Sequence, residues 1–241
     1  ITLDGNGMYN EGKATTLFRV GKEDDVDKPN GVLNVKSGTV MRNFNDDAIY
    51  AYGGDVNVYD GAVFTRGIEK TSSCIYGTGT YLTNSGRDYT SHINVYGGSF
   101  VDNDTRCFNL VGATELNILG GTFARNRLLS GGGAVIYTSV ATTKINIKGG
   151  TFQDNSLLGT SANACGTVLY ANNSTPVTVE GGTFSGNTCA SDPMCNGFTS
   201  YGSKSGPGML LTLKPWAGMD LSSTPLVWFY GVADDAITIT S

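Results

Sequence analysis

Apolar and polar residues alternate in a short motif that recurs along the chain. In the copy INIKGGTFQDN, at Ile145–Asn155, the apolar Ile145 and Ile147 flank the polar Asn146. Because the side chains of a strand point to alternate faces, this predicts a strand with both isoleucines on one face. Two glycines then predict a bend. A threonine and an inward phenylalanine predict a second strand. We expect the closing Asn155 at the next bend, since asparagine tolerates left-handed backbone geometry.

The motif recurs at a period that few repeat folds share. Copies of differing quality occupy Leu33–Asn43, Val56–Arg66, Ile93–Asn103, Leu116–Asn126, Ile145–Asn155 and Val177–Asn187. Only its opening remains at Ile1–Leu3, Leu211–Leu213 and Ile237–Ile239. A further apolar strand pattern follows the copies, as in Val135-Ile136-Tyr137. The copies start about 29.5 residues apart on average. No helical pattern accompanies them, and a four-stranded propeller blade needs ~40 residues or more.

This period predicts an all-β fold: a single parallel β-helix, or solenoid, of about eight coils with three short strands in each coil. The coils stack at strand spacing in such a fold, and loops leave the coil where the interval between copies is long. Crossovers between parallel strands are right-handed in almost all proteins, so we expect a right-handed β-helix. We predict one domain over residues 1–241. The chain begins and ends within a copy, which favours a segment of a longer surface protein.

Two elements of the motif resemble known repeats. GG-[ST]-F elements stand at Gly97–Phe100, Gly120–Phe123, Gly149–Phe152 and Gly181–Phe184, and F-x-x-N pairs at Phe100/Asn103, Phe123/Asn126, Phe152/Asn155 and Phe184/Asn187. They resemble the repeats of polymorphic outer-membrane proteins and autotransporter adhesins of bacteria, within the pectin-lyase-like superfold of right-handed parallel β-helices. The resemblance covers residues 33–187 well and the ends weakly. It implies a fold and an extracellular or cell-surface location, but little about activity, because one fold serves many functions.

Composition and charge exclude some classes of function. The net charge is −5 with a pI of about 4.8, and no basic run occurs, so the chain lacks the clustered lysines and arginines of a nucleic-acid groove. No stretch approaches the ~18 consecutive apolar residues of a membrane helix. We therefore expect no nucleic-acid partner and no membrane insertion by this segment.

The cysteines leave alternatives open, and the metal signals are weak. Cys189 and Cys195 bracket a short loop that a disulfide could close, as suits an extracellular protein. Cys74 and Cys107 open equivalent strands, where they either pair or stack as buried thiols, and we favour buried thiols. The chain has one histidine and no CxxC, so we expect no zinc site. The acidic run Glu23–Asp27 lacks the spacing of a calcium loop, so we favour a solvated loop and expect no cofactor.

The outward positions of the first strand predict a binding face. Its polar residues form a row of amides, Asn34, Asn57, Asn94, Asn117 and Asn146, and two tyrosines follow in adjacent copies. Amides hydrogen-bond sugar hydroxyls, and an aromatic ring stacks on the apolar face of a sugar. The longest loop, 77–91, adds two more tyrosines, and long loops of solenoids gather where ligands bind. We predict a carbohydrate site formed by Asn57, Tyr59, Asn94, Tyr96, Asn117, Tyr81 and Tyr89.

Structural explanations compete with this prediction. Asparagines stacked on a sheet can simply bond one another, which stabilises the sheet without any ligand. A second column, Tyr50, Tyr76, Tyr137 and Tyr170, is either an outward ladder or a corner row with packed rings and wet hydroxyls. The asparagines that end the F-x-x-N pairs, Asn103, Asn126, Asn155 and Asn187, are expected to form an internal structural ladder.

A catalytic site is the less favoured alternative. A glycoside hydrolase needs two carboxylates about 5 to 9.5 Å apart, and the outward row of the motif supplies only Glu180. No catalytic motif of the polysaccharide-cleaving enzymes of the superfold is present, so we name no catalytic residue. We therefore expect a non-catalytic adhesin or binding module whose partner is carbohydrate or, next, a host surface protein. A polysaccharide lyase or hydrolase and a structural stalk remain the alternatives.

Overall fold

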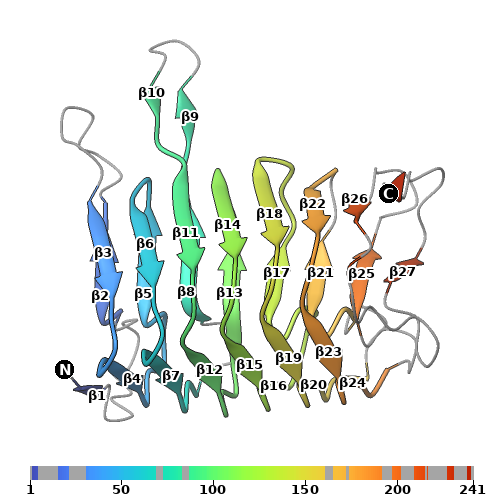
Figure 1. Cartoon of the computed structure of the whole chain (residues 1–241), viewed down its shortest axis with the longest axis horizontal. Coiled ribbons are helices and arrows are strands. Elements are labelled where there is room, and N and C mark those ends of the chain that lie inside the picture. The colour runs from blue at the N-terminus through green and yellow to red at the C-terminus, as the bar shows by residue number, and fades with distance from the viewer. Residues whose placement is uncertain are drawn as a thin grey trace.

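The computed structural model describes residues 2–4, 16–21, 31–68, 73–82, 87–160, 165–171, 174–191, 197–201, 209–214, 216, 227–230 and 238–239. Within these ranges every regular element is a β-strand, and three sheets of parallel strands hold most of them. In Figure 1 the strands of each sheet follow one another along the long axis in chain order. The chain visits the three sheets in turn, so neighbours within a sheet come from successive copies of the motif.

The first sheet takes the opening strand of each copy. Its strands are β3 (Val32–Val35), β6 (Asp55–Val58), β11 (Ser91–Val95), β14 (Thr114–Ile118), β18 (Thr143–Ile147), β22 (Pro176–Val179), β26 (Leu210–Leu213) and β28 (Thr238–Ile239). The register keeps equivalent residues opposite each other, as in Asn57↔Asn94↔Asn117. Within the motif the apolar residues are buried and the polar ones face outward, as predicted, while the polar residues that begin these strands, Ser91, Thr114 and Thr143, are buried too.

The second sheet follows the glycine bend. Its strands are β1 (Thr2–Asp4), β4 (Val40–Arg42), β7 (Val63–Thr65), β12 (Ser99–Val101), β15 (Thr122–Ala124), β19 (Thr151–Gln153) and β23 (Thr183–Ser185). The expectation that Ile1–Leu3 is an opening strand is wrong, since Thr2–Asp4 pairs with Val40–Arg42 of this sheet. Three alternating residues could not distinguish the two sheets, because both place apolar residues inward.

Phenylalanine side chains of the second sheet build a continuous stack in the core. Neighbouring ring centroids lie 4.5 Å apart for Phe64 and Phe100, 5.1 Å for Phe100 and Phe123, and 4.8 Å for Phe123 and Phe152. Phe184 continues the stack at 4.8 Å from Phe152. The predicted inward orientation of the phenylalanine in GG-[ST]-F is therefore confirmed.

The third sheet closes each turn of the chain. Its strands are β2 (Phe18–Val20), β5 (Ile49–Tyr52), β8 (Ser73–Thr78), β13 (Arg106–Leu110), β17 (Ile136–Thr138), β21 (Leu169–Ala171), β25 (Phe198–Tyr201) and β27 (Val227–Tyr230). A small parallel sheet between the second and third is formed by β16 (Arg127–Leu128), β20 (Ser156–Leu157) and β24 (Thr188–Cys189). An antiparallel hairpin, β9 (Tyr81–Leu82) and β10 (Arg87–Asp88), projects beyond β11 (Figure 1). This arrangement is all-β with parallel sheets and is compatible with a parallel β-helix.

Buried asparagines hold the bend after the second sheet. The amide of Asn126 donates to Asn155 Oδ1 at 2.9 Å and accepts from Asn103 Nδ2 at 2.9 Å. Asn126 Nδ2 also donates to the carbonyl of Phe100. Asn187 ends the row, and its Oδ1 accepts a hydrogen bond from Asn155 Nδ2 at 2.9 Å. The expected internal asparagine ladder is therefore confirmed.

The left-handed residue of this bend is not the one we expected. Asp154 has a φ of 53° and Arg125 one of 55°, whereas the following Asn155 and Asn126 are buried ladder members. The asparagine side chain turns inward to bond the backbone of the bend, and the exposed residue before it takes the left-handed geometry. That geometry costs a non-glycine residue roughly 1–2 kcal/mol, which the buried hydrogen bonds of the ladder offset.

The cysteine expectations have two outcomes. Cys74 and Cys107 are buried free thiols on neighbouring strands, in register between Ser73↔Arg106 and Ile75↔Phe108, as favoured from the sequence. Burial and the neighbouring Cys107 thiol raise the pKa of Cys74, which keeps it protonated and unreactive. Cys195 and the acidic run Glu23–Asp27 lie outside the described residues. The Cys189–Cys195 disulfide therefore stays a prediction.

The tyrosine column combines both predicted arrangements. Tyr50 and Tyr76 stack with centroids 4.9 Å apart, and Tyr137 and Tyr170 stack at 5.2 Å. Asn109 separates the two pairs, because it lies opposite both Tyr76 and Tyr137. Tyr170 is buried in a satellite apolar cluster outside the third sheet, with Tyr137 packed against it. The column is therefore a ladder at one end and a packed corner at the other.

Candidate functional site

Three outward rows of side chains cover the first sheet, and the predicted binding residues lie on two of them. Because each strand alternates inward and outward residues, every second residue joins a row that runs across the strands. The register defines an outer charged row, a middle amide row and a mixed row, with two tyrosines, that follows the strand ends. The rows consist of Asp55, His92, Glu115 and Lys144; Asn34, Asn57, Asn94, Asn117 and Asn146; and Lys36, Tyr59, Tyr96, Leu119, Lys148, Glu180 and Lys214.

The amide row is a hydrogen-bonded ladder. Asn94 Nδ2 donates to Asn57 Oδ1 at 3.0 Å, and Asn117 Nδ2 donates to Asn94 Oδ1 at 3.0 Å. The same bond joins Asn57 to Asn34 at 3.1 Å and Asn146 to Asn117 at 2.8 Å. An amide has two N–H donors and an oxygen with two lone pairs, so an internal member uses half of its capacity. The competing structural explanation thus accounts for these contacts. Asn57, Asn94 and Asn117 each keep one donor and one lone pair for a ligand, whereas Asn146 also donates to Glu115 Oε1 at 3.3 Å.

Tyr59 and Tyr96 form the most accessible aromatic group on this face. Their rings stack with centroids 5.2 Å apart and an interplanar angle of 15°, and Tyr96 is 47% exposed. They lie beside a hollow of about 500 Å³, the tyrosine hollow, which Lys36, Ser37 and Asp60 also line. The backbone explains the stacking, because Tyr96 N donates to Val58 O and thereby sets the two tyrosines one strand apart.

The other two predicted tyrosines lie elsewhere. The hairpin β9–β10 projects beyond the N-terminal end of β11 (Figure 1), whereas Tyr96 follows the C-terminal end of that strand. Tyr89 is half-buried, and its backbone packs on Gly53. Seven residues of extended chain separate Tyr89 from Tyr96, which corresponds to ~23 Å. Tyr81 is on β9, and the position of its side chain lies outside the described residues. The structure therefore brings together five of the seven predicted residues.

The charged row escaped the sequence prediction. His92 Nδ1 lies 3.1 Å from Asp55 Oδ1, and Glu115 Oε1 lies 3.5 Å from Lys144 Nζ. The prediction counted outward positions from the first apolar residue of each motif copy, but β11 begins at Ser91 and β14 at Thr114. The residue directly before each copy carries the missed signal, since it is polar or charged in Asp55, His92, Glu115 and Lys144 alike.

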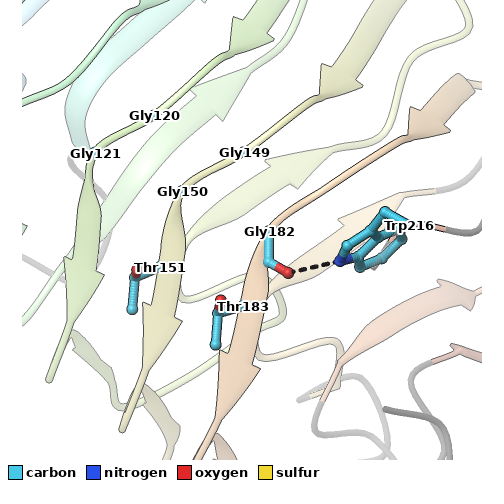
Figure 2. A pocket seen from close by; sticks show the side chains of 8 residues that line it. All are labelled: Gly120, Gly121, Gly149, Gly150, Thr151, Gly182, Thr183 and Trp216. Atoms are coloured by element: carbon cyan, nitrogen blue, oxygen red, sulfur yellow. Dashed lines mark hydrogen bonds between the residues drawn. The ribbon is translucent and has the colours of Figure 1, made fainter. Parts of the chain in front are cut away.

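A second hollow, the glycine hollow, lies at the same bend farther along the sheet. It measures about 490 Å³ and is lined by Gly120, Gly121, Gly149, Gly150, Thr151, Gly182, Thr183 and Trp216. Figure 2 shows Trp216 beside the bend, where its Nε1 donates to the carbonyl of Gly182 at 3.0 Å. The glycines are required by the fold: a Cβ on Gly149 would lie 2.4 Å from the carbonyl oxygen of Leu119, and Gly150 has a φ of 98°.

No described stretch offers a metal-binding cluster or a membrane helix. Groups of three or more His, Cys, Asp or Glu residues able to hold a metal ion do not occur within the described ranges. In the same part of the chain no helix is long and apolar enough to cross a membrane. The chain was also compared with protein-family models, curated proteins and solved structures, and none of the three comparisons finds a match.

Proposed function

We propose that this protein is a non-catalytic binding module that recognises carbohydrate on the outer face of the first sheet. The observation that carries the proposal is the stacked pair of the half-buried Tyr59 and the exposed Tyr96, beside a hollow of about 500 Å³. A tyrosine ring offers an apolar surface and a polar tip, which matches the apolar face and the hydroxyls of a sugar. The adjoining amides of Asn57, Asn94 and Asn117 add free donors and acceptors at regular intervals.

We further infer that the module is a single right-handed parallel β-helix of about eight coils, and a segment of a bacterial cell-surface or secreted adhesin. Support comes from the parallel sheets that the chain visits in turn, and from the general handedness of parallel crossovers. The resemblance of the GG-[ST]-F and F-x-x-N elements to adhesin repeats supports the surface location. A host surface protein is the second partner class.

A glycan screen with matched variants tests the binding proposal. The protein would be applied to immobilised polysaccharides and host glycans, with Ca²⁺ and with a chelator, and retained protein would be measured. We expect calcium-independent retention on one glycan class, lost in the double variant Tyr59→Ala/Tyr96→Ala. The control is Tyr50→Ala/Tyr76→Ala, which removes a similarly stacked pair from the third sheet. Retention that survives the first double variant, or falls equally in both, would show that another face binds.

A polysaccharide hydrolase is the second candidate, and the charged row favours it. Asp55 and Glu115 lie two strands apart with His92 between them, a spacing of about 9.6 Å along the sheet. Inverting glycosidases place their carboxyl groups about 6.5–9.5 Å apart, slightly less than this distance between strands. The supernatants of the glycan screen would be analysed for new reducing ends or unsaturated uronates. Products that disappear in Asp55→Asn or Glu115→Gln would show that the protein is an enzyme and not a binding module. If neither binding nor products are detected, the result would favour a structural stalk.

A further inference from the structure

We propose that the tyrosine hollow and the glycine hollow are two parts of one groove, and that a linear polysaccharide lies in it along the stacking direction of the strands. The inference rests on the proposed function and adds that the carbohydrate is a linear chain. A chain of several sugar units would occupy the groove, rather than the terminal sugar of a branched glycan.

Both hollows lie at the bend between the first and second sheets. In successive turns of the chain the residue after the first-sheet strand makes the same backbone bond: Tyr59 N donates to Val35 O, Lys148 N to Ile118 O, and Lys214 N to Val179 O. The row that follows the strand ends is therefore continuous in its backbone from one hollow to the other, with Leu119, Lys148, Glu180 and Lys214 between Tyr96 and Trp216. Trp216 follows Lys214 by two residues, so it stands at the position that a bend glycine takes in the earlier turns, as Gly150 does after Lys148.

Hydroxyl groups line the side of the groove next to the second sheet. Ser99, Thr122, Thr151 and Thr183 lie opposite one another in register, each at the start of its strand. Their side chains are partly or fully exposed, and none of the four hydroxyls hydrogen-bonds another described residue. Each offers one donor and two acceptor lone pairs. From β12 to β23, a chain lying across the strands would meet a free hydroxyl at every strand, about every 4.8 Å, whereas Val63 takes this position in β7.

The backbone of the bend favours a polysaccharide over an extended peptide. Thr151 N donates to Gly121 O, and Thr183 N donates to Gly150 O, both at 2.9 Å. Because these groups already bond between successive turns, a peptide cannot add to them as a further strand. A ligand must therefore bind through side chains, and the rings and hydroxyls among them are groups that recognise sugars.

Aromatic side chains mark both ends of the groove. Tyr59 and Tyr96 lie at one end, and the half-buried ring of Trp216 forms the wall at the other (Figure 2). Five strand spacings separate Tyr59 from Trp216, or about 24 Å. A mono- or disaccharide cannot contact both ends, and a longer oligosaccharide can.

A chain-length series tests the inference. Oligosaccharides of two to eight units, with β-1,4-linked glucose, N-acetylglucosamine and galacturonate as the probes, would be titrated by calorimetry. We expect affinity for one series to rise with length until the chain spans the groove and then to level off. Equal affinity for the dimer and the octamer would overturn the inference and leave the proposed function standing. Failure of every probe and every polysaccharide would overturn both.

Two variants test where the oligosaccharide binds. Trp216→Ala should lower the affinity of the octamer to that of the short oligomers and leave the short oligomers unchanged. Since Trp216 also bonds Gly182, a second variant avoids any effect on folding. Thr151→Trp fills the middle of the groove and should weaken only the long chains, by about tenfold or more. Its control, Leu158→Trp, adds bulk at an exposed position of the same turn, just after β20 and away from the first sheet, and should change nothing. Unchanged binding of the octamer to Thr151→Trp contradicts the inference.

Discussion

Among single residues, Asp47 shows how burial changes the chemistry of a side chain. Asp47 is 7% exposed, and its Oδ1 accepts hydrogen bonds from Ser73 N at 2.9 Å and Ser73 Oγ at 2.6 Å. No cation pairs with it among the described residues. Loss of hydration outweighs the two hydrogen bonds and raises the pKa of Asp47 from 3.8 to about 7. The folded protein therefore holds a proton that the unfolded chain releases.

The pKa of Asp47 predicts a specific dependence of stability on pH. Its folded pKa is above its unfolded pKa, so the unfolded state loses the proton first, and stability falls as pH rises from about 4 to about 7. Asp47→Asn imitates the protonated carboxyl. We expect it to raise the free energy of unfolding at pH 8, by about 4 kcal/mol at most, and to change it little at pH 4. Urea denaturation at both pH values measures this. Asp154→Asn, on an exposed carboxylate, serves as control, and an equal effect of Asp47→Asn at both pH values would contradict the explanation.

At the scale of elements, both asparagine ladders join the Nδ2 of one side chain to the Oδ1 of a neighbour, but only the inner ladder also bonds the backbone, and the surroundings of the two ladders differ. The inner ladder through Asn126 is buried, whereas the outer ladder through Asn117 is half-exposed. Water can replace a lost bond only in the outer ladder. The inner ladder therefore fixes the bend, while the outer ladder contributes less to stability and remains available to a ligand.

Matched substitutions in the two ladders test this difference. Asn126→Ala removes bonds to Asn103, Asn155 and the carbonyl of Phe100 and leaves their buried groups unsatisfied. We expect it to lower the free energy of unfolding by roughly 3 kcal/mol or more, and Asn117→Ala by less than about 1 kcal/mol. Chemical denaturation of both variants gives the two values. Similar losses would mean that the outer ladder is as important to the fold as the inner one.

A side chain bonds the last glycine bend in the described part of the second sheet. In successive turns the carbonyl of the second bend glycine accepts a bond from the next turn, as Gly121 O does from Thr151 N and Gly150 O from Thr183 N. At Gly182 the indole Nε1 of Trp216 supplies this bond instead of a backbone N–H. Trp216 thus satisfies the carbonyl of the last bend glycine in the described part of the second sheet, at the end of the groove that we propose.

At the scale of the whole molecule, the sequence predicts what repeats and leaves out what does not. The alternation around Asn146 and the phenylalanine of each motif specified parallel strands, the core stack and the amide row, because burial acts on every copy alike. The charged row around His92 was missed because it precedes the apolar alternation. The sequence prediction wrongly placed Tyr89 in the binding site. The direction of its loop depends on contacts that leave no periodic signal in the sequence. Trp216 occurs once, so no repeat revealed its bond to Gly182.

The repeating core predicts that the cost of a cavity depends on position along the stack. Phe123 is fully buried between Phe100 and Phe152, whereas Phe184 is only partly buried at the end of the second sheet. In a stacked array each turn contacts mainly its neighbours, so a central cavity weakens two contacts between turns. We expect Phe123→Ala to lower the free energy of unfolding by about 3–5 kcal/mol and Phe184→Ala by clearly less. Denaturation followed by circular dichroism measures both. Equal losses would mean that the end of the stack is as tightly packed as its middle, in conflict with the partial exposure of Phe184.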